Sequence, residues 1–501
     1  MTASADFALV DATIADIHAA YAAGTLTCRK LVEMYLDRIE KIDRGGPAIN
    51  SIVSTNPQAL EQADALDAAY AKSGPVGPLH GIPLAMKDQG DVKEMPTTMG
   101  SVLFEGHMPK RDSFVTAKLR EAGAIFIAKT TLGEMGAGDT HGSLFGSTKC
   151  VYDLERTAGG SSGGSGAAVS ANLVAAAIGQ EGFASIRRPS IWNGIAGMRP
   201  TAGLVSRGGV YAGWPSINGS LGPMARTVAD CAKLLDVMVG YDPDDPSTAR
   251  GVGQTPQEMS GIGYAGLLED GAALDGARIG VLRTVMGYHS QPDSADFKAV
   301  DALFNGAVAD LAEAGAEIVD PVEIPGLMDL LAKRAADEEA DAEAFRRYAA
   351  GSAASPFATK AEAMASPLYA KTCHGVKMRW ERGGSPEKFN AYLKARDELM
   401  TRMLAVMADH RLDAIVHKAV EHTPTLIKDG VNPPWTDQMG APHLNTFLVY
   451  VPSVVVPTGY TAAGLPAGIT FLGRPYADAE MLMLAHGYEQ ATKHRRVPEL
   501  G

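Results

Sequence analysis

The chain has 501 residues, enough for two or three average domains or for one large α/β domain with insertions. Apolar residues make up 46% of it and charged residues 21%, values typical of soluble globular proteins, which exclude a disordered chain. The formal net charge of −13 at pH 7 argues against a nucleic-acid or anionic-membrane partner, because both kinds of surface attract clustered lysine and arginine.

The cysteines and the N-terminus predict a reduced, cytoplasmic protein. The cysteines lie far apart, fit no metal-ligand spacing and are too few to crosslink a chain of this length. They are Cys28, Cys150, Cys231 and Cys373. The N-terminus has no basic segment, and aspartates interrupt its apolar residues, which argues against a signal peptide. No window approaches the roughly 18 uncharged apolar residues of a membrane span, so we expect no membrane contact.

Residues 1–75 predict an N-terminal helical arm. Apolar residues recur at helical spacing between positions 12 and 42. Gly24 indicates a turn within this stretch, and Thr27 indicates the start of a second helix.

A sheet with covering helices is predicted from residue 79 onward. Apolar runs at 82–86 and 124–128 flank a helical stretch at 112–122. The Ala-rich segment 165–178 predicts a helix of small side chains that can pack closely inside a large domain.

Residues 262–410 predict a helical excursion laid over the core. Here the residue pattern changes to long, charged, Ala-rich stretches with helical periodicity, including 335–350 and 386–408.

Strand-like runs return after the excursion, and an amphipathic helix at about 478–493 closes the chain. The runs are 412–417, 447–457 and 468–472. We find no internal repeat and no linker long enough to divide domains, so the sequence predicts one large α/β domain over residues 1–501.

A Gly/Ser-rich segment at residues 158–166 carries the first candidate catalytic residues. A phosphate loop would need a lysine after the glycines, and this segment has none. The segment also matches the Gly-x-Ser-x-Gly turn of α/β-hydrolases, with Ser162 as nucleophile, but residues 152–156 are too charged for the buried strand that this turn requires. The twelve histidines form no metal motif, and we interpret them as surface or structural residues.

Two serines and a lysine suggest a different chemistry. Ser185 follows Ser161 by 24 positions, and Lys87 precedes both of them. A serine nucleophile, a second serine that relays a proton and a lysine that accepts it can carry out acyl transfer without a metal or another cofactor.

The sequence resembles the amidase signature family of hydrolases in seven segments, which occur in the family's order from about residue 75 to near residue 490. The segments are Gly81-Ile-Pro-Leu-Ala-Met-Lys-Asp88, Ala128-Lys-Thr-Thr-Leu-Gly-Glu134, Ala158-Gly-Gly-Ser-Ser-Gly-Gly-Ser165, 179–189, Gly197-Met-Arg-Pro-Thr-Ala-Gly-Leu-Val-Ser206, Ser220-Leu-Gly-Pro-Met-Ala-Arg226 and Gly464-Leu-Pro-Ala-Gly-Ile469. The resemblance implies a single amidase-signature domain, with a mixed central β-sheet covered by helices on both faces, and it implies no cofactor.

The resemblance also implies a Ser-cisSer-Lys triad. In it Ser185 is the nucleophile, Ser161 is the bridging serine on a cis peptide, and Lys87 is the base. The backbone N–H groups before the nucleophile would form the oxyanion hole, and they belong to Gly182, Phe183 and Ala184.

Lys87 can act as the base only if its pKa falls. At the ordinary lysine pKa of about 10.4, roughly one molecule in 2,500 would be neutral at pH 7. Burial among Ile82, Leu84 and Met86 would disfavour the ammonium and lower the pKa. The expected reaction is hydrolysis of an amide through an acyl-enzyme, and esters and carbamates are open to the same chemistry.

The segment before the nucleophile departs from the family's usual Gly-Thr/Ser-Asp-x-Gly-Gly-Ser-Ile-Arg. Glu181 replaces the aspartate, and Phe183 and Ala184 replace two glycines. Because oxyanion donors are main-chain groups, we expect catalysis to survive and the acyl pocket to be reshaped. Ser162 is a supporting candidate, and so are Glu181 and Arg187, which we interpret as a structural ion pair.

The residues that contact the substrate are harder to predict. Arg188 is a candidate for contact with an anionic substrate, although we favour a structural role for it. Met135 is a candidate for lining an apolar pocket, as for an aryl or apolar amide, although methionines more often fill a core. Substrate identity is expected to depend on residues 134–145, residues 443–447 and the helical excursion.

Three functions stay open. The leading one is a free-standing hydrolase of small-molecule amides. The second is an A-type subunit of a glutamine-dependent amidotransferase, which would supply ammonia to a partner. The third is a binding protein on a non-catalytic amidase scaffold. The family includes monomers and dimers, so a homodimer is compatible with the resemblance.

Overall fold

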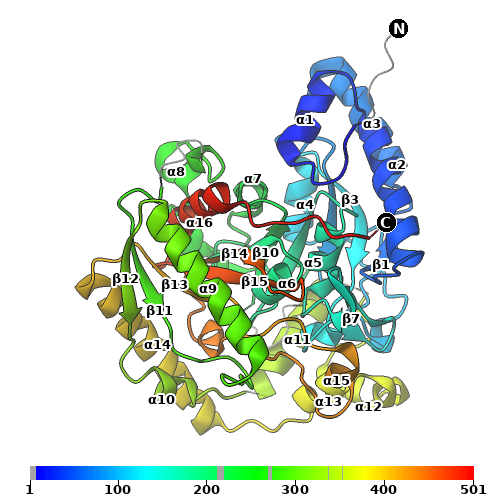
Figure 1. Cartoon of the computed structure of the whole chain (residues 1–501). Coiled ribbons are helices and arrows are strands. Elements are labelled where there is room, and N and C mark those ends of the chain that lie inside the picture. The colour runs from blue at the N-terminus through cyan, green and yellow to red at the C-terminus, as the bar shows by residue number, and fades with distance from the viewer. Residues whose placement is uncertain (1–6, 212–218, 269–272, 337, 353, 501) are drawn as a thin grey trace.

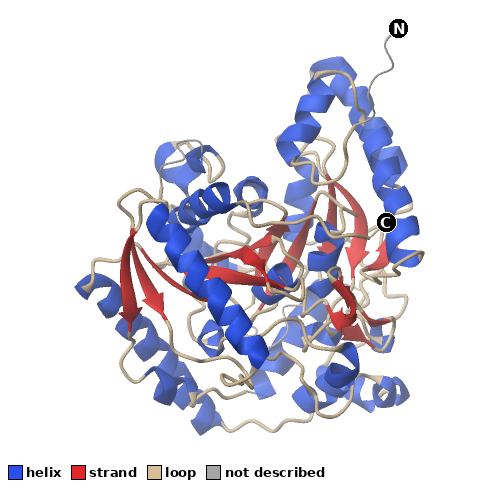
Figure 2. Cartoon of the chain, in the orientation of Figure 1, coloured by secondary structure: helices blue, strands red, loops and turns tan. Residues whose placement is uncertain are grey.

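A large mixed β-sheet forms the centre of the structure, a computed structural model that describes residues 7–211, 219–268, 273–336, 338–352 and 354–500 (Figures 1 and 2). Its strands lie in the order β1-β3-β2-β8-β10-β9-β14-β15-β13-β11-β12. They are β1 (Ile52–Thr55), β2 (Pro83–Lys87), β3 (Ile125–Thr130), β8 (Ala176–Glu181), β9 (Ala196–Arg199), β10 (Ser220–Ala225), β11 (Arg278–Leu282), β12 (Glu317–Val322), β13 (Ala414–Lys418), β14 (Ser453–Tyr460) and β15 (Pro466–Leu472).

This sheet contains both parallel and antiparallel neighbours. β2 is parallel to β3 and β8, whereas β10 is antiparallel to β8 and β9. β14 and β15 are antiparallel, and β11 is parallel to β12 and β13. Two short pairs lie outside the sheet: β4 (His141–Gly142) with β5 (Gly146–Ser147), and β6 (Lys149–Cys150) with β7 (Asp153–Thr157). The predicted mixed sheet is confirmed.

Helices surround the sheet. They are α1 (Ile14–Ala22), α2 (Cys28–Arg38), α3 (Ala59–Ser73), α4 (Phe114–Glu121), α5 (Gly163–Ser170), α6 (Arg187–Trp192), α7 (Val228–Met238), α8 (Pro256–Ser260), α9 (Ala295–Glu313), α10 (Leu327–Leu331), α11 (Glu338–Ser352), α12 (Lys360–Ala365), α13 (His374–Trp380), α14 (Pro386–Asp409), α15 (Ile427–Val431) and α16 (Asp478–Thr492). Among the residues that the structure describes, no helix is both long and apolar enough to cross a membrane.

The alternation of side chains along the strands buries both faces of the sheet. In β11, Val281 belongs to the same hydrophobic cluster as Phe304 of α9, whereas Leu282 belongs to the same cluster as Met403 of α14. Successive side chains of a strand point to opposite faces, so α9 and α14 cover opposite faces of this part of the sheet. Figure 1 shows α9 in front of these strands.

The Ala-rich segment differs from its prediction. A helix was expected over 165–178, but α5 ends at Ser170 and β8 begins at Ala176. Asn172 has a φ of 58°, in the left-handed region that often ends a helix. The residues of β8 are buried between β2 and β10, and a run of small apolar residues does not distinguish a buried strand from a buried helix.

The arm and the excursion both contribute strands, so neither segment is only helical. β1 lies within residues 1–75 and pairs antiparallel with β3 at one edge of the sheet. β11 and β12 lie within residues 262–410 and form the other edge. β12 is mostly exposed and partly charged, which explains why it gave no clear strand pattern in the sequence.

A buried polar network attaches the excursion to the rest of the chain. The Tyr348 hydroxyl of α11 donates to the Asp91 carboxylate at 2.9 Å and lies 3.1 Å from His107 Nε2. Asp91, Tyr348 and His107 are all buried. Burial raises the pKa of Asp91 to about 6, which reflects the cost of placing this carboxylate away from water.

We predict that Tyr348→Phe destabilises the protein. The substitution leaves the ring in place but removes a donor from a buried carboxylate, which costs about 1–3 kcal/mol of unfolding free energy. Tyr241→Phe is the matched control, because Tyr241 is 52% exposed and should change stability by less than about 0.5 kcal/mol. Chemical denaturation of both variants measures the difference. Equal stabilities would show that the hydrogen bond to Asp91 contributes nothing.

Candidate active site

Lys87, the last residue of β2, is buried inside the sheet. Its Nζ lies 2.7 Å from Ser161 Oγ and donates to the carbonyl oxygen of Gln180 at 3.2 Å. Burial lowers the pKa of Lys87 well below 10.5, although the negative charge of Glu181 acts in the opposite direction. The site therefore favours a neutral amine beside a serine hydroxyl.

Ser161 lies in the Gly/Ser-rich segment before α5, and the Gly160–Ser161 peptide bond is cis. The neighbouring glycines allow the backbone to approach other segments closely. A Cβ on Gly160 would clash with the Gly138 carbonyl oxygen, and one on Gly164 would lie 2.5 Å from the Thr131 nitrogen. Both approaches are too close for a real side chain, so glycine is required here by packing.

Arg188 contacts the backbone of this segment at Gly160. Its Nη2 donates to the Gly160 carbonyl oxygen at 2.9 Å and lies 2.6 Å from an oxygen of Asp139. Burial and the charge of Asp437 raise the pKa of the Asp139 carboxyl, and the charge of Arg188 lowers it. The structure thus places Arg188, which is 1% exposed, against the segment that contains Ser161.

Ser185 lies in the turn between β8 and α6, and it is partly exposed. The Ser162 N–H donates to the Ser185 carbonyl oxygen at 3.1 Å, which joins the two serine segments through their backbones. The Ser162 hydroxyl donates to the Gln180 carbonyl oxygen at 3.2 Å. The three predicted triad residues and Ser162 thus come from segments that contact one another.

Glu181 fixes the turn that carries Ser185. Its carboxylate accepts from the backbone N–H groups of Ile186 and Arg187 at 2.9 and 3.0 Å, and it pairs with the Arg187 guanidinium at 2.6 Å. Burial alone would raise the pKa of Glu181, but the charges of Arg187 and Arg199 and these hydrogen bonds hold it below its ordinary value. Glu181 and Arg187 form the ion pair that the sequence indicated.

Phe183 and Ala184 fit the turn without an unusual backbone. Among the described residues with a positive φ, none lies between Gly182 and Ser185. The turn therefore does not need the conformations that only glycine adopts easily, and the Phe183 side chain causes no strain of this kind. Gly182 and Phe183 line the same cavity as Ser185.

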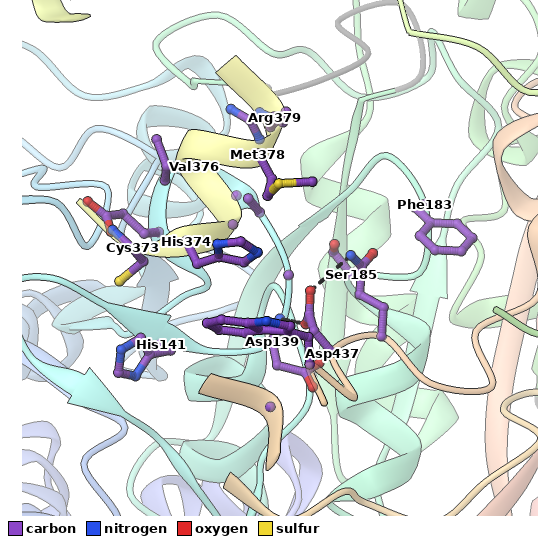
Figure 3. Close-up of a pocket in the computed structure, with 18 of the residues that line it drawn as sticks. Asp139, His141, Phe183, Ser185, Cys373, His374, Val376, Met378, Arg379 and Asp437 are labelled. Atoms are coloured by element: carbon purple, nitrogen blue, oxygen red, sulfur yellow. Dashed lines mark hydrogen bonds between the residues drawn. The ribbon is translucent and has the colours of Figure 1, made fainter. Parts of the chain in front are cut away.

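The cavity in front of Ser185 has a volume of about 480 Å³. Its walls come from the loop after β3, the β8–α6 turn, the segment between α10 and α11, α13, and residues 427–438. Figure 3 shows Phe183 on one side of Ser185 and the pair Asp139 and Asp437 on the other. Within the described part of the chain, neither Met135 nor Arg188 is among the lining residues; both are buried beside the wall.

Several lining residues have no signal in the sequence. Arg334, Asp437 and Arg379 face this cavity from segments without a motif, and only the general expectation for the excursion pointed toward two of them. Asp139 and His374 also line it, and they lie within residues 134–145 and the excursion, two of the regions expected to determine substrate identity. In the described residues, no group of three or more histidine, cysteine, aspartate or glutamate side chains is arranged to hold a metal ion.

Comparisons with known proteins identify the family of this chain. A family model described as Amidase matches residues 30–482. The chain is 31% identical to the A-type subunit of a glutamyl-tRNA(Gln) amidotransferase from Symbiobacterium thermophilum, with 95% of each chain covered. It is 30% identical to a probable amidase of Arabidopsis thaliana, with 99% of this chain and 93% of that one covered. The solved structure of the peptide amidase from Stenotrophomonas maltophilia matches with 31% identity, 99% coverage of both chains and a TM-score of 0.83. The chain belongs to the amidase signature family of amide-hydrolysing serine enzymes.

Proposed function

We propose that this enzyme hydrolyses a small-molecule carboxamide through a Ser185–Ser161–Lys87 triad and an acyl-enzyme. The observation that supports it best is the buried Lys87 amine, 2.7 Å from Ser161 Oγ, in a segment whose backbone contacts that of Ser185. Esters and carbamates are open to the same chemistry. We also propose a cytoplasmic location, which the four unpaired cysteines support, because thiols stay reduced there.

The contacts of Lys87 give the proton relay a direction. A neutral amine has two N–H bonds and one lone pair, and the Gln180 carbonyl accepts one N–H at 3.2 Å. The lone pair can then accept the hydrogen of the Ser161 hydroxyl across 2.7 Å. Ser161 Oγ, with its hydrogen directed toward Lys87, keeps lone pairs for the hydrogen of Ser185.

The reaction follows from this arrangement. As Ser185 Oγ attacks the carbonyl carbon, its proton moves to Ser161 and the Ser161 proton moves to Lys87. Lys87 then returns a proton through Ser161 to the nitrogen of the leaving amine, the C–N bond breaks, and the acyl group stays on Ser185. Water attacks the acyl-enzyme with the same relay in use, and the acid leaves.

The oxyanion of the tetrahedral intermediate needs donors near Ser185. We propose the backbone N–H groups of Gly182, Phe183 and Ala184, because this turn leads directly into the nucleophile and borders the cavity. Glu181 and Arg187 support this oxyanion site as a structural ion pair, since Glu181 also accepts a hydrogen bond from the backbone N–H that follows Ser185.

We predict that Ser185→Ala and Lys87→Met each lower kcat by about 10³-fold or more, because each removes one member of a coupled relay. Ser190→Ala is the matched control. Ser190 is a buried serine of α6 whose hydroxyl has no hydrogen-bond partner in the described structure, so its loss should leave turnover close to that of the wild type. Steady-state assays on a panel of amides, anilides, esters and carbamates measure the effect. Turnover by Ser185→Ala at the wild-type rate would refute the mechanism.

The pH dependence of kcat/KM tests Lys87 as the base. Only the neutral amine accepts a proton, so the rate should rise as the pH increases through the pKa of Lys87 and then level off. Because burial places this pKa well below 10.5, the plateau should be reached before pH 10.5. Circular dichroism at each pH shows that the protein stays folded. A profile that still rises above pH 10.5, or one without an ascending limb, would contradict the assignment.

An amidotransferase subunit remains the second candidate, because the amidotransferase relative is as similar in sequence as the peptide amidase. The substitution of Phe183 and Ala184 for the usual glycines argues for a different acyl pocket. We predict that the purified chain alone hydrolyses a member of the amide panel at least about tenfold faster than glutamine, compared by kcat/KM. If glutamine were the best substrate, and its hydrolysis required co-purifying subunits, the amidotransferase function would be the correct one.

A further inference from the structure

Arg188 follows Ser185 in the first turn of α6, and its side chain reaches the other serine segment. Its backbone N–H donates to the carbonyl oxygen of Ala184 at 3.0 Å, and its Nη2 donates to the carbonyl oxygen of Gly160 at 2.9 Å. Ala184 directly precedes Ser185, and Gly160 directly precedes Ser161. One residue is therefore hydrogen-bonded to the chain immediately before each serine of the proposed relay.

The Gly160 carbonyl belongs to the peptide group from which Ser161 continues. A peptide group is planar, so this carbonyl, the Ser161 nitrogen and the Ser161 Cα lie in one plane. The carbonyl of Ser161 itself accepts from the Gly133 N–H at 3.0 Å. The contact between Arg188 and Gly160 thus restricts the backbone before Ser161, and the contact with Gly133 restricts the backbone after it.

The place of Ser161 matters because its hydroxyl has two partners in the relay. Ser161 Oγ lies 2.7 Å from Lys87 Nζ, and in the proposed mechanism it also takes the proton of Ser185. Proton transfer needs heavy atoms about 2.6–3.2 Å apart, so a displacement of about 1 Å is enough to interrupt it. The relay therefore depends on how the two serine segments lie relative to each other.

Asp139 holds the Arg188 guanidinium beside Gly160. One oxygen of its carboxylate lies 2.6 Å from the same Nη2 that donates to the Gly160 carbonyl oxygen. The Asp139 backbone N–H in turn donates to the Asp437 carboxylate at 2.5 Å. A Cβ on Gly160 would lie 2.7 Å from the Asp139 Cα, so the two backbones are in close contact. The orientation of Arg188 is thus set by a segment that packs directly on Gly160.

Stability alone is a poor explanation for an arginine at this position. Arg188 is 1% exposed, and among the described residues its Nε and Nη1 have no hydrogen-bond partner. Its guanidinium lies over the Trp192 ring, 5.2 Å from the ring centroid. An apolar side chain of similar size often stabilises a protein as well as a buried ion pair does. Such a side chain would lose the hydrogen bond to Gly160.

We propose that Arg188 is a positioning residue, which holds Ser161 in place against Ser185. Asp139 orients the Arg188 guanidinium for this role. The inference rests on the proposed function, because it assumes a relay through Ser161, and it extends that relay to a residue outside the described cavity lining. Loss of Arg188 should then slow the reaction only while Ser161 is present to be positioned.

The rate at which a fluorophosphonate labels Ser185 tests this dependence without a choice of substrate. Arg188→Met removes the donor and the charge but keeps an unbranched side chain, and it should slow labelling by about 10–100-fold. In a Ser161→Ala background the same substitution should change the rate by less than about threefold, because the residue that it positions is gone. An equal loss in both backgrounds, or no loss in either, would overturn the proposal.

Two matched variants separate the hydrogen bond from the burial of an arginine. Arg188→Lys keeps a donor and a positive charge beside Asp139, so labelling should stay within about fivefold of the wild-type rate. A rate as low as that of Arg188→Met would overturn the role of the donor.

Arg226→Met is the control for the loss of a buried guanidinium. Arg226 is 3% exposed and donates to the Val174 carbonyl oxygen at 2.9 Å, before β8 begins, whereas Ser185 follows the end of β8. Its loss should change labelling by less than about threefold. Circular dichroism shows that each variant is folded. A loss as large as that in Arg188→Met would show a general effect of removing a buried arginine and would overturn the proposal.

Asp139→Asn tests the orienting role in a chain that keeps Arg188, and it serves as the second variant if Arg188→Met does not fold. It should slow labelling by about three- to tenfold, and it should have no further effect in the Ser161→Ala background. A loss that persists without Ser161 would show that Asp139 acts directly through the cavity, which would overturn its orienting role.

Steady-state kinetics separate this inference from the proposed function. With an amide that the wild type hydrolyses, Arg188→Met should lower kcat by about 10–100-fold and leave KM within about threefold, because Arg188 is not among the described lining residues. A change in KM alone would show a distorted cavity and overturn the proposal. If Ser185→Ala is inactive but Arg188→Met has the wild-type kcat, the inference is wrong and the proposed function stands. If Ser185→Ala keeps full turnover, the proposed function is wrong.

Discussion

The rest of the site depends on one buried contact, between the Lys87 amine and the Ser161 hydroxyl, which lie 2.7 Å apart. In water the ammonium would dominate at neutral pH, so the fold must make the charged form unfavourable. It does so by placing Lys87 at the end of a strand whose residues are all buried, between β3 and β8. The same register brings Gln180 of β8 close enough to accept an N–H from Lys87. The central sheet thus both lowers the pKa of Lys87 and orients its amine.

The other buried charges around this amine are compensated. Glu181 is held by Arg187 at 2.6 Å, and Lys129 pairs with Asp88 at 3.0 Å inside the sheet. This matters for Lys87, because a nearby carboxylate raises the pKa of an amine. The carboxylate of Glu181 acts in that direction, but burial has the larger effect and the pKa of Lys87 still falls. Glu181 can therefore hold the turn that carries Ser185 through two backbone N–H groups while the pKa of Lys87 stays lowered.

The sequence was most informative where chemistry or burial leaves a local pattern. Lys87, Ser161 and Ser185 lie in short motifs, and β2 and β13 are apolar runs within a residue or two of their predicted positions. The end of α5 could not be read, because alanine and valine suit a buried strand and a buried helix equally well. The residues of the cavity wall could not be predicted from the sequence either, since residues 427–438 and the segment before α11 approach Ser185 only through tertiary packing.

At Phe183 the sequence shows where the chain departs from its family, but it does not show which residues the new side chain contacts. In the sequence Phe183 replaces a glycine, which restricts the backbone, and the expected consequence is a reshaped acyl pocket. The turn has no positive φ from Gly182 to Ser185, so replacing the glycines does not strain its backbone. The consequence lies in the side chain, which meets Arg334 and His443 from distant segments. Phe183, in the turn that carries Ser185, thereby brings a side chain of the excursion into contact with the cavity wall, at a place that Lys87 and Ser161 do not reach.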